Sequence, residues 1–221
     1  TELFDMPPEI IPDHPTFGNY LKVLGNSKMF RAFFNSAFIT ACVVLLTLFF
    51  SVLAGYGLAR YQFKGHGLMK VALLFGQMVP GVVIIIPLYS VFTKLGLLDT
   101  HFSMIVADMA LTIPMGVIML SSFFEGVPKE LEEAAKIDGC NSVKTLWYVI
   151  VPMLKPSLVS CALFQFMWTN NDFQGPLIYI ADMDKYTNSV YLRMSMDGDV
   201  GFQWNRILAM SLISIIPSLV V

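Results

Sequence analysis

Polar and amphipathic side chains inside long apolar runs are the residues of this chain whose types and spacing could do chemistry. They are Asp108, Gln165, Trp168, Thr169, Asn170, Asn171 and Asp172. Gln165, Thr169 and Asp172 recur at i, i+4 and i+7, the spacing that places side chains on one face of a helix. Small solutes are bound by aromatic surfaces with a few convergent polar groups. An indole ring beside amides and carboxylates suits a sugar, so these residues are candidates for a solute pathway.

Other roles are open for the same side chains. Acids within apolar spans are rare and mark functional sites, but they can also satisfy backbone groups freed at helix breaks or lie at a subunit interface. A further hypothesis makes Asp108 and Asp172 a catalytic carboxylate pair, which would need shared burial and access to water. That hypothesis leaves the long charged segment 125–155 without a role.

Motifs for phosphate or metal chemistry are missing from the sequence. Neither G-x-x-x-x-G-K-[ST] nor H-E-x-x-H occurs, and His14, His66 and His101 are isolated. The cysteines at positions 42, 140 and 161 lie far apart, without the spacing of a disulfide framework or a zinc site. We therefore expect neither a catalytic residue nor a metal site in this chain, and its small net charge gives no sign of nucleic acid binding.

The composition indicates a polytopic membrane protein. Apolar residues make up 56% of the chain and charged residues 14%, with a mean hydropathy of +0.66. Ordinary soluble domains hold about 45–50% apolar and about 25% charged residues. The charge-poor blocks are long enough for the roughly 20 helical residues that cross a bilayer, so they predict an all-α fold. We predict membrane spans at 33–59, 68–92, 101–124, 156–180 and 204–221.

Charge in the connecting segments predicts the orientation. Residues 60–70 carry three basic side chains and no acid, so the positive-inside rule places them in the cytoplasm. Alternation then places 125–155 in the cytoplasm and 181–203 outside. Residues 1–32 are expected to form an extracytoplasmic segment and lead-in rather than a signal peptide. Because the sequence lacks an initiator Met and ends in an apolar run, we expect a piece of a longer polypeptide with about six spans.

The segment 125–155 is amphipathic where the rest of the chain is apolar. Pro128 suits a first helical turn, and three glutamates follow near the positively polarised end of that helix. Gly139 is placed to end the helix in a left-handed conformation, and Ser142 can cap a second helix that Pro152 ends or kinks. Two short helices joined at a glycine would suit docking in another protein's groove or lying on lipid headgroups.

This segment resembles the EAA motif of binding-protein-dependent ABC importer permeases, and residues 125–155 are called the EAA loop below. The motif residues are Glu133-Ala134-Ala135, Gly139 and Val149-Ile150-Val151-Pro152, with Val149 and Val151 in place of the usual Ile and Leu. Flanking matches are Asn35-Ser36, Ala54-Gly55-Tyr56, Leu58-Ala59-Arg60, Pro87-Leu88-Tyr89, Pro128 with Glu132, Ile137-Asp138-Gly139 and Pro176-Leu177-Ile178. Together they look like the smaller, second permease of the maltose-type carbohydrate subfamily. The stretch Trp168 to Phe173 departs from the family by an extra or displaced polar residue.

The resemblance implies an ABC importer transmembrane domain, multi-pass in a bacterial-type cytoplasmic membrane. Its expected partners are a second permease subunit in a heterodimer, two cytoplasmic ATPase subunits, an extracytoplasmic solute-binding protein and a sugar substrate. The chain itself would perform no covalent chemistry and bind no cofactor, because ATP and Mg²⁺ would bind the ATPase subunits. The alternative is an importer of another solute, such as a polyol phosphate or a polyamine. A phosphate would favour cationic pathway residues, whereas these spans hold acids and amides, so neutral sugars fit better.

The resemblance also implies roles for individual residues. Coupling to the ATPase would fall to Glu133, Ala134, Ala135, Asp138, Gly139 and Pro152. Contact with the binding protein would fall to Tyr186, Tyr191 and Arg193 in the external segment, which could equally be a plain surface loop.

Overall fold

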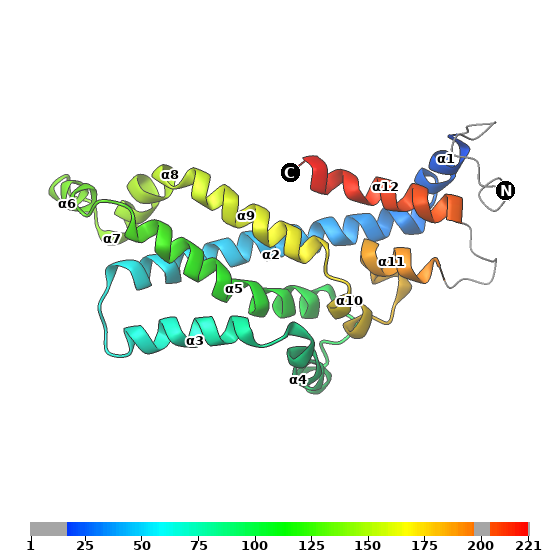
Figure 1. Ribbon diagram of the computed structural model, residues 1–221, viewed down its shortest axis with the longest axis horizontal. Coiled ribbons are helices and arrows are strands. Elements are labelled where there is room, and N and C mark those ends of the chain that lie inside the picture. The colour runs from blue at the N-terminus through cyan, green and yellow to red at the C-terminus, as the bar shows by residue number, and fades with distance from the viewer. Residues whose placement is uncertain (1–16, 197–203, 221) are drawn as a thin grey trace, which may run out of the picture.

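The computed structural model describes residues 17–196 and 204–220, and every regular element in that part of the chain is a helix. The predicted all-α fold is therefore confirmed. The molecule is elongated, with α6 (Glu130–Ile137) at one end of its long axis and α11 (Asn188–Met194) toward the other (Figure 1). Those two ends correspond to the segments that the sequence predicts on opposite sides of a membrane.

Two helices are each long and apolar enough to cross a bilayer by themselves. They are α2 (Ser27–Arg60) and α5 (His101–Glu125). At 1.5 Å per residue, the 34 residues of α2 extend about 51 Å, well beyond the roughly 30 Å of hydrocarbon. Both run in the same direction along the long axis, and they pack against each other over much of their length (Figure 1).

Small residues allow the close approach of α2 and α5. A Cβ added to Gly55 would lie 3.1 Å from the backbone nitrogen of Ser121 on α5, and one on Gly116 would lie 3.1 Å from the Cβ of Ser51 on α2. Thr47 and Thr112 share a hydrogen bond of 3.2 Å across the same contact. Lipid tails are as apolar as leucine, so helices in a bilayer associate through this kind of tight packing and hydrogen bonding.

The predicted spans 68–92 and 156–180 are not single straight helices. The first is divided into α3 (His66–Met78) and α4 (Gly81–Leu95), bent by 96° at Pro80. The second is divided into α9 (Lys155–Asn170) and the short α10 (Gln174–Tyr179). Pro80 breaks its helix because it lacks an N–H and restricts the residue before it, whereas Pro87 lies within α4 and Pro114 within α5. These breaks open the bundle where polar side chains gather.

Four further elements lie toward the end of the long axis that the sequence predicts to be external. They are α1 (Gly18–Leu24), a single 3-10 turn η3 (Met183–Lys185), α11 and α12 (Trp204–Val220). α12 falls within the predicted fifth span. A cluster of Val23 on α1, Met29 on α2 and Ala209 and Met210 on α12 holds it, and Tyr191 and Leu192 of α11 pack against this cluster. The predicted lead-in 1–32 is partly helical, since α2 already begins at Ser27, and residues 1–16 lie outside the described part.

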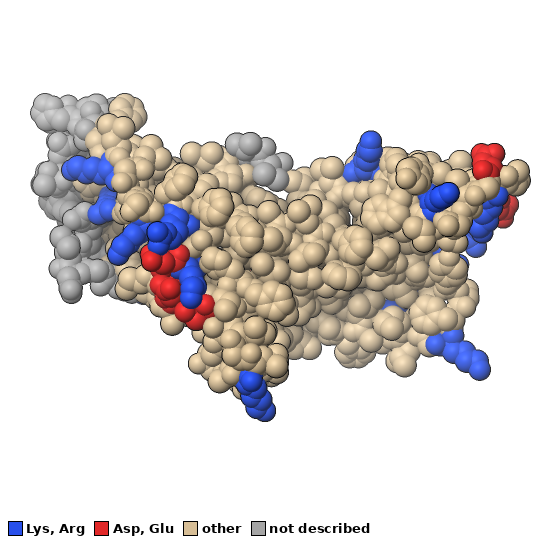
Figure 2. All heavy atoms as spheres, turned by 180° about the vertical axis from the view of Figure 1, so that it is seen from behind, with Lys and Arg blue, Asp and Glu red and all other residues tan. Residues whose placement is uncertain are grey.

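Charged and apolar side chains occupy different parts of the surface along the long axis. In Figure 2, most Lys, Arg, Asp and Glu side chains of the visible face gather toward the two ends, and uncharged residues dominate the middle. Large apolar side chains on α2, such as Phe34, Leu45 and Phe49, are exposed there. A continuous exposed apolar belt is what lipid or another membrane subunit requires.

Gly55→Ala is predicted to destabilise the chain, because the added methyl group would meet backbone atoms of α5 at 3.1 to 3.3 Å. Overpacking of this kind costs about 1–3 kcal/mol. The matched control is Gly57→Ala on the same helix, where no atom lies within 4 Å of the new Cβ; it should be neutral or stabilising by up to about 1 kcal/mol. Thermal unfolding in detergent would measure both, and equal effects would contradict the packing argument.

Candidate functional site

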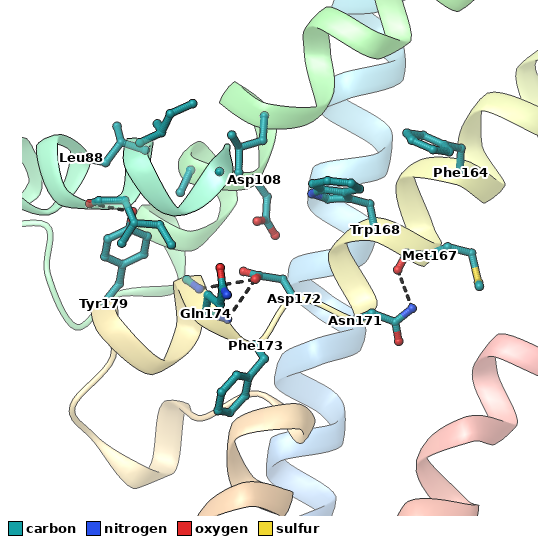
Figure 3. A pocket seen from close by; sticks show the side chains of 16 residues that line it. Leu88, Asp108, Phe164, Met167, Trp168, Asn171, Asp172, Phe173, Gln174 and Tyr179 are labelled. Carbon is teal, nitrogen blue, oxygen red and sulfur yellow. Dashed lines mark hydrogen bonds between the residues drawn. The ribbon is translucent and has the colours of Figure 1, made fainter. Parts of the chain in front are cut away.

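A pocket of about 600 Å³ lies between the broken helices. α4 contributes Gly81, Ile84, Ile85 and Leu88; α5 contributes Ala107, Asp108 and Leu111; and residues 164–179 contribute Phe164, Met167, Trp168, Asn171, Asp172, Phe173, Gln174, Gly175 and Tyr179. Figure 3 shows the Asp108 and Asp172 carboxylates pointing toward each other across it, with the Trp168 indole beside them. Asp108 and Asp172 are the only charged groups among the described residues that line this pocket.

Asp172 has a structural contact as well as a place in the pocket. It follows the end of α9, and its Oδ1 accepts hydrogen bonds from the backbone N–H groups of Gln174 (3.1 Å) and Gly175 (3.4 Å) at the start of α10. A Cβ on Gly175 would lie 2.6 Å from Oδ2 of Asp172, so a larger residue here would require the Asp172 carboxylate to shift. One carboxylate oxygen therefore satisfies backbone freed by the helix break, and the other is available to a ligand.

Asp108 is the more enclosed of the two acids. It is 4% exposed, and within residues 17–196 and 204–220 no group donates a hydrogen bond to its carboxylate. A buried carboxylate without a donor is costly to retain. Its acceptor capacity is directed into the pocket, where a ligand hydroxyl or amine would satisfy it.

The predicted pathway residues are only partly brought together. Asp108, Trp168, Asn171 and Asp172 line the pocket, whereas Gln165 and Asn170 do not. Gln165 is completely buried beside Gly116, and Asn170 donates a hydrogen bond to the Ser218 hydroxyl of α12 (3.3 Å). The face shared by Gln165, Thr169 and Asp172 thus packs into the bundle until α9 ends, and Thr169 is itself buried. The sequence pattern did not indicate some of the lining residues, because they are apolar or lie beyond the helix break; these are Gly81, Phe164, Gln174 and Tyr179.

The EAA loop consists of α6, α7 (Ser142–Thr145), a π-helical turn η2 (Leu146–Ile150) and α8 (Val151–Met153). Gly139 joins α6 to α7 with φ +83°, which confirms the predicted left-handed cap. Two other predictions were wrong by a residue or two. Asn141, not Ser142, caps α7 by accepting from the Lys144 N–H (2.8 Å), and Pro128 precedes α6 instead of occupying its first turn. The chain bends by 81° after α8, next to Pro152.

The coupling residues implied by the resemblance are mostly exposed. Glu133, Ala134, Asp138, Gly139 and Pro152 face outward, and Ala135 is buried. The neighbouring apolar side chains of Ile137 (86% exposed), Val143 and Tyr148 are also uncovered. α6 lies at the tip of the molecule, beyond the end of α2 (Figure 1). This arrangement presents a surface to a partner beyond the membrane ends of the spans.

The residues predicted to meet a binding protein differ in exposure. Tyr186 packs against the cluster of Ile39 and Met104, and the Tyr191 hydroxyl accepts a hydrogen bond from Asn26 (3.1 Å). Both tyrosines are half-buried, and only Arg193 is exposed. The two tyrosines therefore hold the external segment onto the bundle, which the sequence pattern did not indicate. Within the described residues, no group of three His, Cys, Asp or Glu side chains could hold a metal ion.

Asp99 links the loop after α4 to the segment after α10. It occupies a left-handed conformation (φ 59°), and its carboxylate accepts from the N–H groups of Ala181 (3.1 Å) and Asp182 (3.0 Å) and from Nζ of Lys185 (2.8 Å). The hydrogen bond from Lys185 lowers the pKa of Asp99, helped by the two backbone donors. The same contact raises the pKa of Lys185.

Comparison with known proteins gives consistent matches. The family model described as "Binding-protein-dependent transport system inner membrane component" matches residues 48–221. The probable ABC transporter permease protein YurM of Bacillus subtilis is 36% identical over 88% of this chain, which covers 65% of that relative, less than two thirds of its length. The trehalose/maltose transport system permease protein MalG of Thermococcus litoralis is 34% identical over 91% of this chain and 73% of its own.

A solved structure has the same fold. It is the crystal structure of a bacterial ABC transporter involved in the import of the acidic polysaccharide alginate, with a TM-score of 0.83 and 25% identity. The match covers 95% of this chain and 78% of that chain.

Asp99→Asn is predicted to loosen the external loops in a pH-dependent way. Asparagine tolerates the positive φ but removes the charge. Because the pKa of Asp99 is lowered on folding, its contribution is present above the unfolded value of about 3.9 and is lost as pH falls through the folded value. The contribution of Lys185, whose pKa is raised, is present below about pH 10.4 and is lost at higher pH.

The melting temperature should therefore be lower for the variant at pH 7, and the gap from the unmodified chain should close below about pH 4. Asp184→Asn is the matched control, because it breaks an ion pair with Arg31 whose side chains are both 57% exposed; such pairs contribute little. A gap for Asp99→Asn that is the same at pH 3 and pH 7 would contradict the role of its charge.

Proposed function

Because the chain belongs to the family of binding-protein-dependent transport system inner membrane components, we propose that it is the permease subunit of an ATP-driven importer of sugars or oligosaccharides. It forms the translocation pathway with a second permease and is driven by two cytoplasmic ATPase subunits through the EAA loop. An extracytoplasmic binding protein delivers the solute to the external end. The chain itself catalyses no reaction, since ATP and Mg²⁺ bind the ATPase subunits.

The observation that carries this proposal is the exposed motif at the cytoplasmic tip. Glu133, Ala134, Asp138 and Gly139 lie uncovered on α6 and the turn after it. A lipid-lying helix would turn its apolar face to the headgroup layer alongside the spans. α6 instead projects past the ends of α2 and α5 (Figure 1), where a soluble partner can enclose it. Its small residues permit the close contact that helix-in-groove recognition needs.

The pocket supports a neutral polyhydroxylated solute. Trp168 offers an aromatic face, and Asp108 and Asp172 offer acceptors for hydroxyl groups. Hydrogen bonds to charged groups are among the stronger ones, worth about 1.5–3 kcal/mol. A phosphorylated polyol would meet two carboxylates and, among the described lining residues, no cation. The related permease named for trehalose and maltose fits the same class of solute.

The test is ATP hydrolysis by the complex of this chain, a second permease, the ATPases and the binding protein, reconstituted in lipid. The panel comprises maltose, trehalose, diacetylchitobiose, arabino-oligosaccharides, glycerol phosphate and spermidine. Stimulation by one of the sugars only when the binding protein is present is expected. Stimulation by glycerol phosphate or spermidine would show that the solute belongs to another class, and the assignment as an ATP-driven importer would stand. Ala134→Asp, which places a charge on the exposed motif, should abolish association with the ATPases. If the unmodified chain does not associate with any ATPase, the proposal is overturned.

Asp172→Asn is predicted to weaken uptake of the stimulating sugar. Asparagine keeps an acceptor for Gln174 and Gly175, so α10 stays capped and the change is confined to the charge. The KM for uptake should rise about tenfold, the effect of losing one hydrogen bond to a charged group. Asn170→Ala is the matched control, because Asn170 contacts Ser218 outside the pocket. An unchanged KM in Asp172→Asn would leave this acid with a structural role only.

A further inference from the structure

A buried polar cluster attaches the EAA loop to the end of α2. The carboxylate of Glu132 accepts from Nε of Arg60 and, through its second oxygen, from the Tyr56 hydroxyl (3.1 Å). Nη2 of Arg60 donates to the carbonyl oxygen of Val127 (2.8 Å), in the turn between α5 and α6. The Arg60 and Glu132 side chains are only 6% and 10% exposed. Tyr56, Arg60, Val127 and Glu132 are called the Arg60–Glu132 cluster below.

This cluster joins α6 to the ends of α2 and α5, the two helices that pack against each other over much of their length. Arg60 is the last residue of α2, Val127 follows α5, and Glu132 lies in α6. The planar guanidinium donates in two directions at once, to a carboxylate and to a carbonyl, which a lysine ammonium does with much less directional control. Tyr56 also packs edge-on against Phe124 of α5, with ring centroids 5.6 Å apart. The cluster is therefore continuous with the α2–α5 packing.

The other attachments of α6 are apolar: Leu131 packs against the core that contains Tyr56 and Leu146, and Ala135 is buried. α6 contains eight residues, of which only Glu132 and Ala135 are buried. Isolated helices of this length are marginal in water, so its position must come from tertiary contacts. Glu132 is directed inward and the adjacent Glu133 outward, so one acid holds the helix and the other faces a partner. The sequence alone does not separate these two glutamates.

We propose that the Arg60–Glu132 cluster is a positioning site that holds α6 rigidly to α2, so that displacement of the EAA loop by the ATPases moves α2 and the pocket-lining helices with it. This inference rests on the proposed function. If α6 were attached only through its flexible connections, movement of the ATPases would turn α6 without moving the spans. Arg60, Glu132 and Tyr56 contact neither solute nor nucleotide, and they act by fixing the residues that do contact the ATPase.

The experiment uses the reconstituted complex and needs no knowledge of the solute. Gln174→Cys places a thiol on the pocket, and mass spectrometry follows its reaction with a maleimide before and after trapping with Mg-ATP and vanadate. In the parent complex, trapping should change the reaction rate at least about fivefold, the lower end of typical coupling between distant sites. Glu132→Gln, Arg60→Lys and Tyr56→Phe are then added one at a time.

Glu132→Gln and Arg60→Lys are expected to trap nucleotide as the parent does while the pocket thiol no longer responds. Amide hydrogen exchange over residues 128–140 should quicken about tenfold, as expected when a charge-assisted hydrogen bond is lost. Tyr56→Phe removes one hydroxyl group. Its thiol response and its rate of amide exchange should therefore lie between those of the parent complex and those of Glu132→Gln. A role in stability alone would reduce trapping and thiol response together, so that result overturns the proposal.

The matched control is Glu125→Gln. It breaks the other ion pair at this end of the molecule, between Lys70 and Glu125, whose side chains are 40% and 49% exposed. It should leave the response intact, because exposed pairs contribute little. A normal thiol response in both Glu132→Gln and Tyr56→Phe would overturn the proposal. If the Glu132→Gln complex does not assemble, a normal thiol response in Tyr56→Phe alone overturns it. Failure of the parent complex to trap nucleotide would instead count against the proposed function.

Discussion

The close packing of α2 against α5 is the contact on which the rest of this structure depends. Between helices in lipid there is no hydrophobic driving force, so association relies on near approach and shared hydrogen bonds. Gly55 and Gly116 permit that approach, and the Thr47–Thr112 hydrogen bond adds a polar contact within it. α9 is then packed against the same pair of helices. A larger side chain at either glycine would move the framework that both functional regions share.

Both ends of α2 are attachment points. Toward its N-terminal end, Asn35 donates to the carbonyl oxygens of Asp184 (3.0 Å) and Tyr186 (3.1 Å), and Ser36 accepts from the Asn188 N–H (2.8 Å). At its C-terminal end, Arg60 holds Glu132. Removing one member of a buried ion pair costs about 3–5 kcal/mol, because the other charge is left unpaired. α2 therefore connects the external segment with the EAA loop as one rigid helix.

The pocket exists because two spans are broken. Backbone that leaves a helix at membrane depth must be satisfied by protein or line a cavity. At the end of α9, Asp172 meets that requirement by accepting from the first N–H groups of α10. Beyond the end of α9, the Asp172 carboxylate is turned toward Asp108, with the Trp168 indole beside them, whereas the Asn171 amide is directed away and donates to the carbonyl oxygen of Met167 (Figure 3). The break thus places Asp172 where one carboxylate both stabilises the backbone and lines the pocket.

The sequence by itself determined the class of fold, the helical EAA loop with its glycine turn, and the acids as pathway candidates. Those features follow from local rules: apolar runs of membrane length, the φ that glycine allows at position 139, and the cost of burying a charge. Only the tertiary structure decided which polar residues meet. Helical periodicity grouped Gln165 with Asp172, but α9 ends between Asn170 and Asp172, so the two face different surroundings. The tertiary structure also decided that Glu132 is held by Arg60 while Glu133 is exposed. The burial of each glutamate depends on how α6 packs against α2, which no local pattern encodes.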